Sequence, residues 1–412
     1  MNRAADSPKK ILIFYHYFYP DDVVSAQHYS HLAEDLRARG WMVVVLTSNR
    51  ARHDPTIKYP RFENWNGVEI RRVWRPGFRQ DSVIQRFLTA SWMIGAWCLA
   101  AFRKASIPDV DVIVVGTDPM MSIGCIPIWK LVRPRTKIVH WCFDLFPDIA
   151  VAAGLLGEDS IPFKMVRRLC RWIYTLCDLI VDTSSCQRKR LGAGDIPARK
   201  ATCTPWAIVE PKHPVAIDEA ERKKLFGAAR LALLYSGNLG RAHDYDMFVE
   251  LARRLRNENT CVVFGVRGSR SEELERDIAA TDEIIRLCDF VSMDRLEARL
   301  SAPDIHLLSL RPEWTGTLVP SKFFGALAIG RPVIFCGSPE SAIAKWITKH
   351  RIGWFLTRDT IDSVVADMIR LAADPDSLEG MRKRCHGVYQ EHFARKKVID
   401  IWHRELLSLI DT

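Results

Sequence analysis

The chain has 412 residues, which is too long for one ordinary hydrophobic core and suits two α/β domains. Hydrophobic residues make up 48% of it and charged residues 26%, so it can bury a sizeable interior. The formal net charge of +10 favours anionic partners such as phosphates or an acidic membrane face, although a basic solvated surface explains it equally well. No run of lysine and arginine is long enough to indicate a nucleic-acid tail, so we expect no nucleic-acid partner.

The eleven cysteines are scattered, odd in number and without a Cys-x-x-Cys pair, which argues against a zinc site. We therefore expect no metal and a reduced, cytoplasmic chain. The polar N-terminus MNRAADSPKK lacks the apolar core of a signal peptide.

The first predicted elements form a βαβ unit. The apolar run 11–18 predicts a strand, the helical periodicity of 26–39 predicts a helix that ends at Gly40, and MVVVLTS (42–48) predicts a buried parallel strand.

The apolar segment 83–102 approaches the length of a membrane span but carries Gln85 and Arg86 at its start. Three interpretations stay open: a helix packed within the domain, a surface helix that touches lipid, or a true span. Arginines precede the segment from residue 71 onward, a pattern typical of an interfacial membrane site. We therefore predict peripheral membrane contact through residues 71–102, on the inner face of the cell membrane, which suits a polyprenyl-diphosphate-linked acceptor.

The alternation of strand and helix continues through the rest of the chain and restarts after a polar linker, EPKHPVAI (210–217). Two such runs predict two doubly wound sheets. Before the linker we predict strands 111–116, 137–141 and 179–182, a helix 163–175, and a helix cap at 183–185. After it we predict strands 231–237, 261–265, 289–293, 305–310 and 332–337, and helices 246–256, 322–329 and 398–410.

The turn LYSGNLGR ends a predicted strand and has the features of a phosphate site. Gly237 and Gly240 flank Asn238 and let the backbone approach a ligand, and Arg241 supplies a charge for diphosphate oxygens. An ordinary βα turn is the alternative interpretation.

A second cluster, Gly316-Thr317-Leu318-Val319-Pro320-Ser321-Lys322, leads into a helix followed by Gly330-Arg331-Pro332. Ser321 is a candidate helix cap, and free amides at the helix start suit a phosphate. A cation in the first turn conflicts with the helix dipole, so Lys322 is expected to serve a ligand rather than to be a solvated helix residue.

These segments resemble family 4 retaining glycosyltransferases of the GT-B type. PSKFFGALAIGRPVI resembles their PSK…E…A.GRPV segment, and YSGNLGRAHDYDMFVELARRL their Y.GN.G segment. YHYFYPDDVVSAQHYSHLAEDLRARGWMVVVLTS is similar to their opening segment, and HWCFDLFPDIAVAAGLL to their D-l-y-P loop. The resemblance runs from about residue 10 to about residue 400 and is nearest to members that build bacterial polysaccharides on lipid carriers.

The resemblance implies an α/β fold of two Rossmann-like doubly wound domains that face a cleft. Residues 1–210 would bind the acceptor, residues 211–391 would bind the nucleotide-diphosphate sugar, and the helix 392–412 would pack back on the first domain. Transfer would retain the anomeric configuration and need neither metal nor cofactor. Arg241 and Lys322 would hold the leaving diphosphate, and His243 stands near the place where relatives carry a second cation.

The chain also departs from the family pattern. The residue that is usually a ribose-binding Glu is Gly325, its partner acid is replaced by Thr317, and Glu313 is nearby but out of register.

In the first half, His140 and Asp144 follow the strand 137–141 at the carboxyl end, where open sheets bind ligands. We expect Asp144 to contact the acceptor and to act as a base. His140 either shares that role or is hydrogen-bonded in the core, and the aromatic loop from Tyr15 to Tyr19 either lines the acceptor cleft or belongs to the core.

The sequence therefore predicts a hexosyltransferase that moves a sugar to a lipid-linked or glycan acceptor. A non-catalytic binding subunit of the same fold, or a nucleotide-sugar epimerase, is the alternative.

Overall fold

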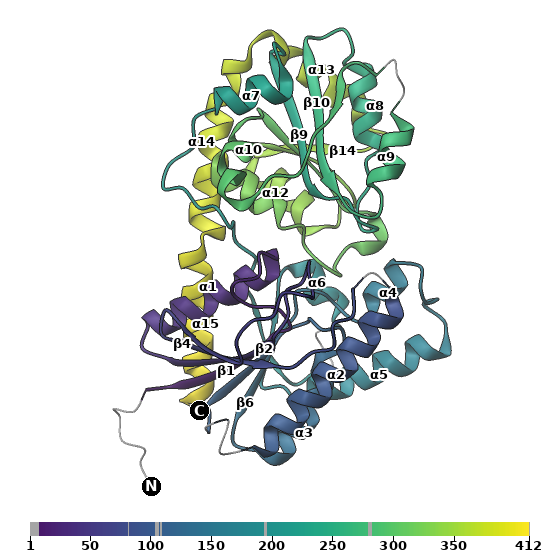
Figure 1. Ribbon diagram of the computed structural model, residues 1–412. Coiled ribbons are helices and arrows are strands. Elements are labelled where there is room, and N and C mark those ends of the chain that lie inside the picture. Colours follow the sequence, from purple (N-terminus) through teal and green to yellow (C-terminus); the bar gives the residue numbers. More distant parts are fainter. Residues whose placement is uncertain are drawn as a thin grey trace. The chain divides into compact units, whose positions relative to one another are not determined.

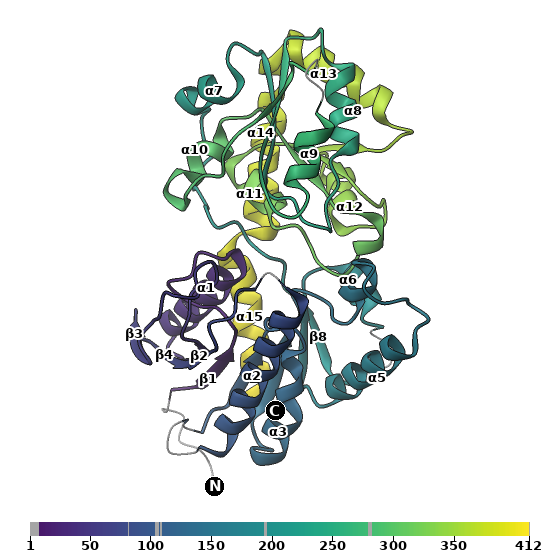
Figure 2. The ribbon, with the colours of Figure 1, turned by 45° about the vertical axis from the view of Figure 1, so that its right-hand side comes forward.

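The computed structural model describes residues 8–80, 82–103, 107, 109–192, 196–278 and 282–411. The chain divides into two compact units (Figures 1 and 2). The N-terminal unit comprises residues 1–204 and 399–412, and the C-terminal unit comprises residues 205–398.

The N-terminal unit contains an eight-stranded sheet of order β3-β4-β2-β1-β5-β6-β7-β8. Its strands run parallel except for β3, which pairs antiparallel with β4. The central strands are short apolar runs buried on both faces, as parallel sheets require. The strands are β1 (Lys10–Phe14), β2 (Met42–Ser48), β3 (Phe62–Trp65), β4 (Val68–Val73), β5 (Val112–Val115), β6 (Lys137–Trp141), β7 (Leu179–Asp182) and β8 (Arg199–Thr202).

Helices cover both faces of this sheet. The hydrophobic cluster on one face joins the sheet to α2, α3 and α5, and Phe14 there stacks on Trp97 with ring centroids 5.2 Å apart. On the other face Tyr29 of α1 packs on Trp141 of β6. The helices are α1 (Val24–Ala38), α2 (Val83–Phe102), the 3₁₀ turn η1 (Ser122–Cys125), α3 (Ile126–Val132), α4 (Asp148–Ala152), α5 (Ile161–Thr175) and α6 (Ser185–Arg190).

The C-terminal unit contains a six-stranded parallel sheet of order β11-β10-β9-β12-β13-β14. Its strands are β9 (Leu231–Asn238), β10 (Thr260–Arg267), β11 (Ile285–Leu287), β12 (Ile305–Ser309), β13 (Val333–Cys336) and β14 (Gly353–Leu356). Alternate residues of β9 face two separate clusters: Leu233 and Tyr235 lie with α8 and α13, and Ala232 and Leu234 lie with α7.

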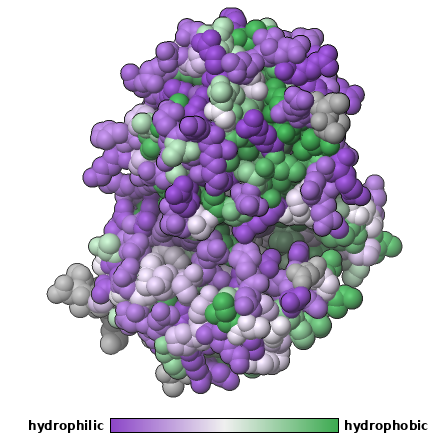
Figure 3. All heavy atoms as spheres, turned by 45° about the horizontal axis from the view of Figure 1, so that its top comes forward, coloured by the Kyte–Doolittle hydropathy of each residue, from purple (hydrophilic) through white to green (hydrophobic). Residues whose placement is uncertain are grey.

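The helices of this unit follow the strands in doubly wound order. They are α7 (Glu219–Phe226), α8 (Asp246–Arg254), α9 (Ser271–Asp277), η2 (Met293–Arg295), α10 (Leu296–Ser301), η3 (Pro312–Trp314), α11 (Lys322–Ile329), α12 (Ala342–His350), α13 (Ile361–Ala373), η4 (Pro375–Leu378), α14 (Glu379–Val388) and the π-helical turn η5 (Tyr389–Phe393). On the face drawn in Figure 3, hydrophilic residues cover most of the surface and hydrophobic residues gather in patches.

The last helix, α15 (Arg395–Ile410), begins in the C-terminal unit and ends in the N-terminal unit. Its later residues pack into the N-terminal core: Trp402 lies against Trp141 with centroids 4.8 Å apart, and Asp400 accepts a 2.7 Å hydrogen bond from Arg39. The resemblance to the family predicts that the whole segment 392–412 packs on the N-terminal unit, whereas the structure places residues up to 398 in the C-terminal unit and only those from 399 onward in the N-terminal unit.

In each sheet the strand order reverses beside the first strand. The reversal lies between β1 and β5 in the N-terminal unit and between β9 and β12 in the C-terminal unit. Ligands of open α/β sheets bind at such switch points, outside the carboxyl ends of the strands.

The predicted fold class, two Rossmann-like doubly wound units, is confirmed. The predicted strand 289–293 is wrong, because residues 289–292 lie in irregular structure and Met293 starts a 3₁₀ turn. The short strand that flanks β10 is instead β11. The linker 210–217 lies within the C-terminal unit: Pro214 packs near Gly330, and Arg331 donates to the Val215 carbonyl.

The helix predicted at 83–102 is present with those bounds as α2. By length and composition it is the one helix in the described chain that could cross a membrane. However, Met93 and Trp97 are fully buried, and Trp129 Nε1 donates to the Trp97 carbonyl at 2.9 Å. One face of α2 is therefore a core face, whereas Ile84 and Phe87 on the rest of the helix are 73% and 62% exposed.

Candidate functional site

The switch point of the C-terminal sheet brings Lys322 against the end of β9. Lys322 Nζ donates to the Asn238 carbonyl at 2.9 Å and lies 4.0 Å from the centroid of the Tyr235 ring. Gly237 has φ +122°, and a Cβ atom there would lie 2.7 Å from Lys322 Cε. Only glycine therefore allows both this backbone conformation and the approach of the lysine. The two predicted motifs thus meet at one place.

Lys322 is a cation held in an unusual position. It is the first residue of α11, where the helix dipole disfavours positive charge, and no carboxylate in the described part of the chain pairs with it. Burial lowers the pKa of Lys322 to about 7. Its main-chain N–H has no partner among the described residues, so the amide is free to bind an anion, and the ammonium group has two N–H donors besides the one that bonds the Asn238 carbonyl.

The loop after β9 is fixed by bonds to two neighbouring strands. The Leu239 amide donates to the Arg267 carbonyl of β10 at 2.7 Å, and His243 Nδ1 donates to the Ser309 carbonyl of β12 at 2.7 Å. Burial, followed by the nearby charge of Lys322, lowers the pKa of His243 to about 3. His243 is therefore a neutral anchor of the loop and does not act as a second cation.

Gly240 and Arg241 form the tip of this loop. A Cβ atom at Gly240 would lie 3.1 Å from Asn238 Nδ2, so the turn is tight. Arg241 is exposed and has no hydrogen-bond or ion-pair partner among the residues described. Arg241 follows Asn238 by three residues, so the loop that Lys322 contacts carries a cation of its own.

The segment from Gly316 to Ser321 leads into α11. Gly316 has φ +78°, Thr317 is buried and donates to the Trp314 carbonyl at 2.8 Å, and a bridge joins residues 315 and 318, which places Leu318 in a compact turn. Ser321 occupies the N-cap position, but its φ and ψ are helical and its side chain makes no capping bond. The expectation that Ser321 caps the helix is therefore wrong.

Arg331 of the Gly-Arg-Pro segment is fully buried and lies away from any anion site. Its guanidinium donates to the carbonyls of Pro303, Ser301 and Val215 at 2.9, 2.8 and 3.0 Å. Arg331 of the GRPV motif therefore has a structural role, because it joins the end of α10 to the linker.

Gly325 lies within α11 and is half-buried. A Cβ atom there would meet Leu300 Cδ1 at an ordinary 3.6 Å. The space around the position thus accepts a side chain, although this chain offers none for a ribose.

In the N-terminal unit, His140 is only 2% exposed. Its Nδ1 donates to the Val115 carbonyl at 2.9 Å, its ring stacks on Tyr174, and burial lowers its pKa to about 4. This geometry favours the core interpretation of His140.

Asp144 follows β6 and is half-buried. Burial raises the pKa of Asp144 to about 7, and the negative charge of Asp118 adds to this rise. Asp118 follows β5 and accepts a 2.9 Å hydrogen bond from Nδ1 of His16, which follows β1. The His16 and Asp118 pair therefore lies at the switch point of the N-terminal sheet.

His16 and Asp118 form a pair that the sequence analysis did not identify, although His16 lies in the loop from Tyr15 to Tyr19 that it considered for the acceptor cleft. His16 is buried, and its Nε2 has no partner, as is also true of the hydroxyls of Tyr17, Tyr29 and Thr117. Unpartnered buried polar atoms are rare and indicate a place for a ligand or water. The available sequence signal was that His16 and Asp118 lie two and three residues after apolar strands, but their pairing across 102 positions depends on the strand order.

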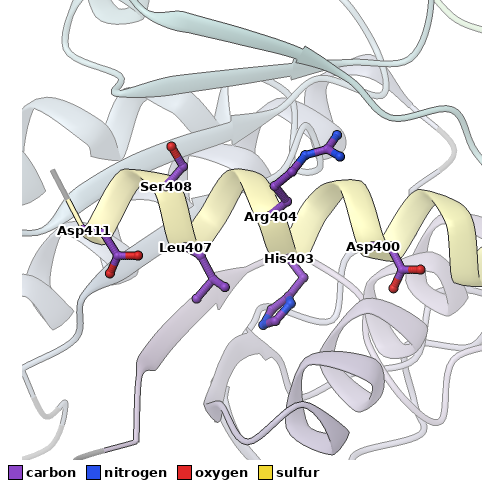
Figure 4. Close-up of a pocket in the computed structure, with 6 residues that line it drawn as sticks. All are labelled: Asp400, His403, Arg404, Leu407, Ser408 and Asp411. Carbon is purple, nitrogen blue, oxygen red and sulfur yellow. The ribbon is translucent and has the colours of Figure 1, made fainter. Parts of the chain in front are cut away.

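A hollow of about 640 Å³ along α15 is a weaker candidate (Figure 4). Its lining residues belong to α15 except Asp411, which follows the helix, and Arg404 and Ser408 lie on one side with His403 and Leu407 on the other. Its Asp400 and Ser408 are already bonded to Arg39 and Arg199.

Among the described residues no three metal-ligating side chains are grouped, and all eleven cysteines are free thiols.

Two family models match the chain. Residues 25–206 match the glycosyl transferase 4-like domain, and residues 230–374 match the glycosyl transferases group 1.

Two curated proteins are similar in sequence. The probable glycosyltransferase WbjE of Pseudomonas aeruginosa is 25% identical over 253 residues, and this alignment covers 59% of the present chain and 62% of WbjE. The putative colanic acid biosynthesis glycosyl transferase WcaI of Escherichia coli strain K12 is 23% identical over 347 residues, which cover 78% of this chain and 81% of WcaI.

Solved structures share the fold across almost the whole chain. Sucrose-phosphate synthase of Thermosynechococcus elongatus superposes with a TM-score of 0.72 at 16% identity, covering 97% of this chain and 99% of that one. Anabaena HepE, in complex with UDP and glucose, superposes with a TM-score of 0.65 at 12% identity, covering 97% and 100%.

Proposed function

Because the chain belongs to the glycosyltransferases of GT-B fold, we propose that it transfers a sugar from a nucleotide-diphosphate sugar bound by its C-terminal unit. The acceptor is a lipid-linked or glycan hydroxyl in bacterial polysaccharide biosynthesis. The colanic acid relative supports this setting, and the UDP complex of HepE supports the donor class.

The observation that carries the proposal is Lys322, a half-buried lysine without a carboxylate at the switch point of the C-terminal sheet. A diphosphate would supply the missing negative charge. In the reaction, the bond between the anomeric carbon and the diphosphate oxygen breaks, and negative charge grows on that oxygen. Lys322, its free amide and the nearby Arg241 would stabilise this charge.

The finer features follow from the resemblance to family 4. The reaction would retain the anomeric configuration and use neither metal nor cofactor, since the two cations replace a divalent ion as the partner of the diphosphate. Nuclear magnetic resonance of the first product formed, before it mutarotates, tests the configuration, and an inverted product would refute retention.

The acceptor hydroxyl would bind in the N-terminal unit, at the switch point formed by β1 and β5. His16 donates Nδ1–H to Asp118, so its neutral Nε2 is a hydrogen-bond acceptor without a partner. Asp144 lies near Asp118 and, with its raised pKa, could hold or release a proton near neutral pH.

Membrane contact completes the proposal. The exposed apolar side of α2 supports peripheral association with a lipid surface, where a lipid-linked acceptor resides. Of the arginines that precede α2, Arg79 is exposed, whereas Arg72 and Arg75 are buried and do not face a lipid surface as the sequence suggested.

The test replaces Lys322 by Ala and measures UDP binding by calorimetry and sugar transfer with the donor that the wild-type protein uses. We expect the loss of at least about two orders of magnitude in transfer, because one preorganised charge at the leaving group is worth that much. The melting temperature should not fall, because Lys322 pairs with no carboxylate in the described chain. Wild-type activity in this variant would refute the site assignment.

A second candidate is a non-catalytic binding subunit, which the glycine at position 325 favours. A wild-type protein that binds none of UDP, GDP and ADP would support this alternative over the enzyme.

A further inference from the structure

A groove of about 590 Å³ lies in the N-terminal unit between α2 and the strands β2, β3 and β4. Its described lining contains four arginines, namely Arg61, Arg71, Arg72 and Arg103, and no aspartate or glutamate. Two tryptophans, Trp74 and Trp92, form part of its wall. A volume of this size suits a small ligand or a headgroup.

The four arginines differ in how far they are already neutralised. Arg71 pairs with Glu69 and Arg72 with Glu63, each at 2.6 Å. Arg61 and Arg103 are exposed, and neither has a carboxylate partner in the described chain. The groove therefore carries two uncompensated positive charges.

Arg72 provides the groove with a charged side chain that is held in place by hydrogen bonds. It is almost fully buried: its Nη2 donates to the Tyr19 carbonyl at 2.7 Å, and its Nη1 donates to the Pro60 carbonyl at 3.0 Å. Its Nε is buried and has no partner. An unpartnered donor on a buried charged side chain costs free energy unless a ligand or water accepts its proton.

The neighbouring surface is apolar and lies beside the charges. Trp92 Nε1 donates to the Trp74 carbonyl at 2.7 Å, and both indole rings remain about half exposed. Tryptophans with one wet and one apolar side are typical of membrane interfaces. From Trp92 the exposed side of α2 continues with Leu88, Phe87 and Ile84.

We propose that this groove binds the diphosphate headgroup of a membrane lipid whose hydrocarbon chain lies along the exposed side of α2. The charges match a diphosphate, because two free guanidinium groups and the Arg72 Nε–H are all donors. The apolar side of α2 suits a hydrocarbon chain, which neither a free nucleotide nor a nucleic acid has. The proposal rests on the lipid-linked acceptor of the proposed function for its role, although the binding itself needs no transfer.

The core face of α2 shapes this interaction. Met93 and Trp97 fix the helix to the sheet, so α2 lies on the lipid surface and does not cross it. The groove then opens beside a helix at the depth of lipid headgroups, where basic side chains attract anionic lipid.

The experiment measures co-sedimentation of the full chain with three kinds of phosphatidylcholine vesicle: unmodified, doped with a long-chain polyprenyl diphosphate, or doped with phosphatidylglycerol to equal charge. We expect the diphosphate vesicles to bind most tightly. In the double variant R61Q/R103Q the preference for diphosphate vesicles should fall by at least about tenfold. The variant removes the two unpaired guanidinium groups of the groove, and each basic residue near a lipid surface contributes to the binding of anionic lipid. The variant I84S/F87S should bind all vesicles more weakly.

The control variant is R256Q, which removes an exposed arginine of the C-terminal unit and should bind like the wild type. Melting temperature and UDP binding check that each variant is folded. Equal binding of diphosphate and phosphatidylglycerol vesicles, or an unchanged preference in R61Q/R103Q, would overturn the proposal. The K322A variant should still bind the vesicles, because Lys322 lies in the C-terminal unit. Vesicle binding therefore tests this proposal independently of the donor site.

Discussion

At the scale of single residues, Lys322 shows how a site is prepared before its ligand arrives. A lysine that is desolvated, placed at a positive helix end and left without a carboxylate is held at a cost in stability. The Asn238 carbonyl and the Tyr235 ring offset only part of that cost, since both are neutral. A diphosphate would supply the remaining counter-charge.

The lowered pKa of Lys322 makes nucleotide binding depend on pH. In the free protein this pKa is about 7, and a bound diphosphate would raise it, so binding takes up a proton above pH 7. We expect the Kd of UDP to rise between pH 7 and pH 9 by up to about tenfold per pH unit. Calorimetry in buffers of different ionisation enthalpy would measure both the Kd and the proton uptake.

The variant K322R is the matched control, because arginine stays charged throughout this range. Its UDP affinity should be nearly independent of pH. An equal pH dependence in both proteins would assign the effect to another group.

Gly325 offers a second test at this scale. The resemblance places a ribose-binding Glu here, and the backbone geometry accepts a Cβ atom. We expect G325E to bind UDP about tenfold more tightly than the wild type, since a carboxylate accepting hydrogen bonds from the ribose hydroxyls is worth roughly that much. The control G325A gains the same helix propensity without the carboxylate, so equal UDP affinities of the two variants would contradict the assignment.

At the scale of elements, Arg331 joins segments that the sequence presents as separate motifs. It donates to carbonyls at the end of α10 and in the linker, and a 2.8 Å bond from its own amide to the Ala326 carbonyl ends α11. The helix that positions Lys322 is therefore anchored at its far end by a buried arginine.

We predict that R331K destabilises the C-terminal unit by about 3 kcal/mol, because lysine cannot reach three carbonyls in a planar fork and leaves a buried charge underbonded. Urea unfolding followed by the fluorescence of tryptophans would measure the loss. UDP binding well below the unfolding midpoint should stay unchanged, since Arg331 lies away from the proposed anion site. A variant as stable as the wild type would show that the bonds contribute little.

At the scale of the whole molecule, the sequence predicts the centre of each sheet better than its edges. Central strands such as β2, β6 and β12 are continuous apolar runs that periodicity detects. The edge strands β3 and β8, FENW and RKAT, are polar, and they escaped detection because their pairing depends on a neighbour and not on their own composition.

The same limit applies to the candidate sites. Lys322 was found because the helix dipole conflicts with it locally, whereas its contact with Asn238 required the strand order of β9 and β12. The pairing of His16 with Asp118 was missed because only the reversal between β1 and β5 brings the two residues together. The motif GRPV contributes to the resemblance to the family, and its arginine has a structural role.

The two units should respond differently to acid. In the C-terminal unit burial lowers the pKa of His243 to about 3 and of His306 to about 4, from an ordinary 6.5. Such a group binds fewer protons when folded, so its contribution to stability falls as the pH drops from about 6.5 to about 4. In the N-terminal unit His140 and His16, whose pKa values burial also lowers, act in the same direction, but burial raises the pKa of Asp144 to about 7 and of Asp21 to about 6.

These buried carboxyl groups bind more protons when folded, so they add stability as the pH falls and offset the histidines of the N-terminal unit. We therefore expect amide-exchange protection between pH 7 and pH 4.5 to fall further in β9 and β12 than in β1 and β6, by a few kcal/mol at most. Mass spectrometry of peptides from each unit, corrected for the intrinsic exchange rate, measures this difference. H306Q keeps the hydrogen bond to the Leu300 carbonyl without a titrating ring and should reduce the loss, whereas equal losses in both units would refute the prediction.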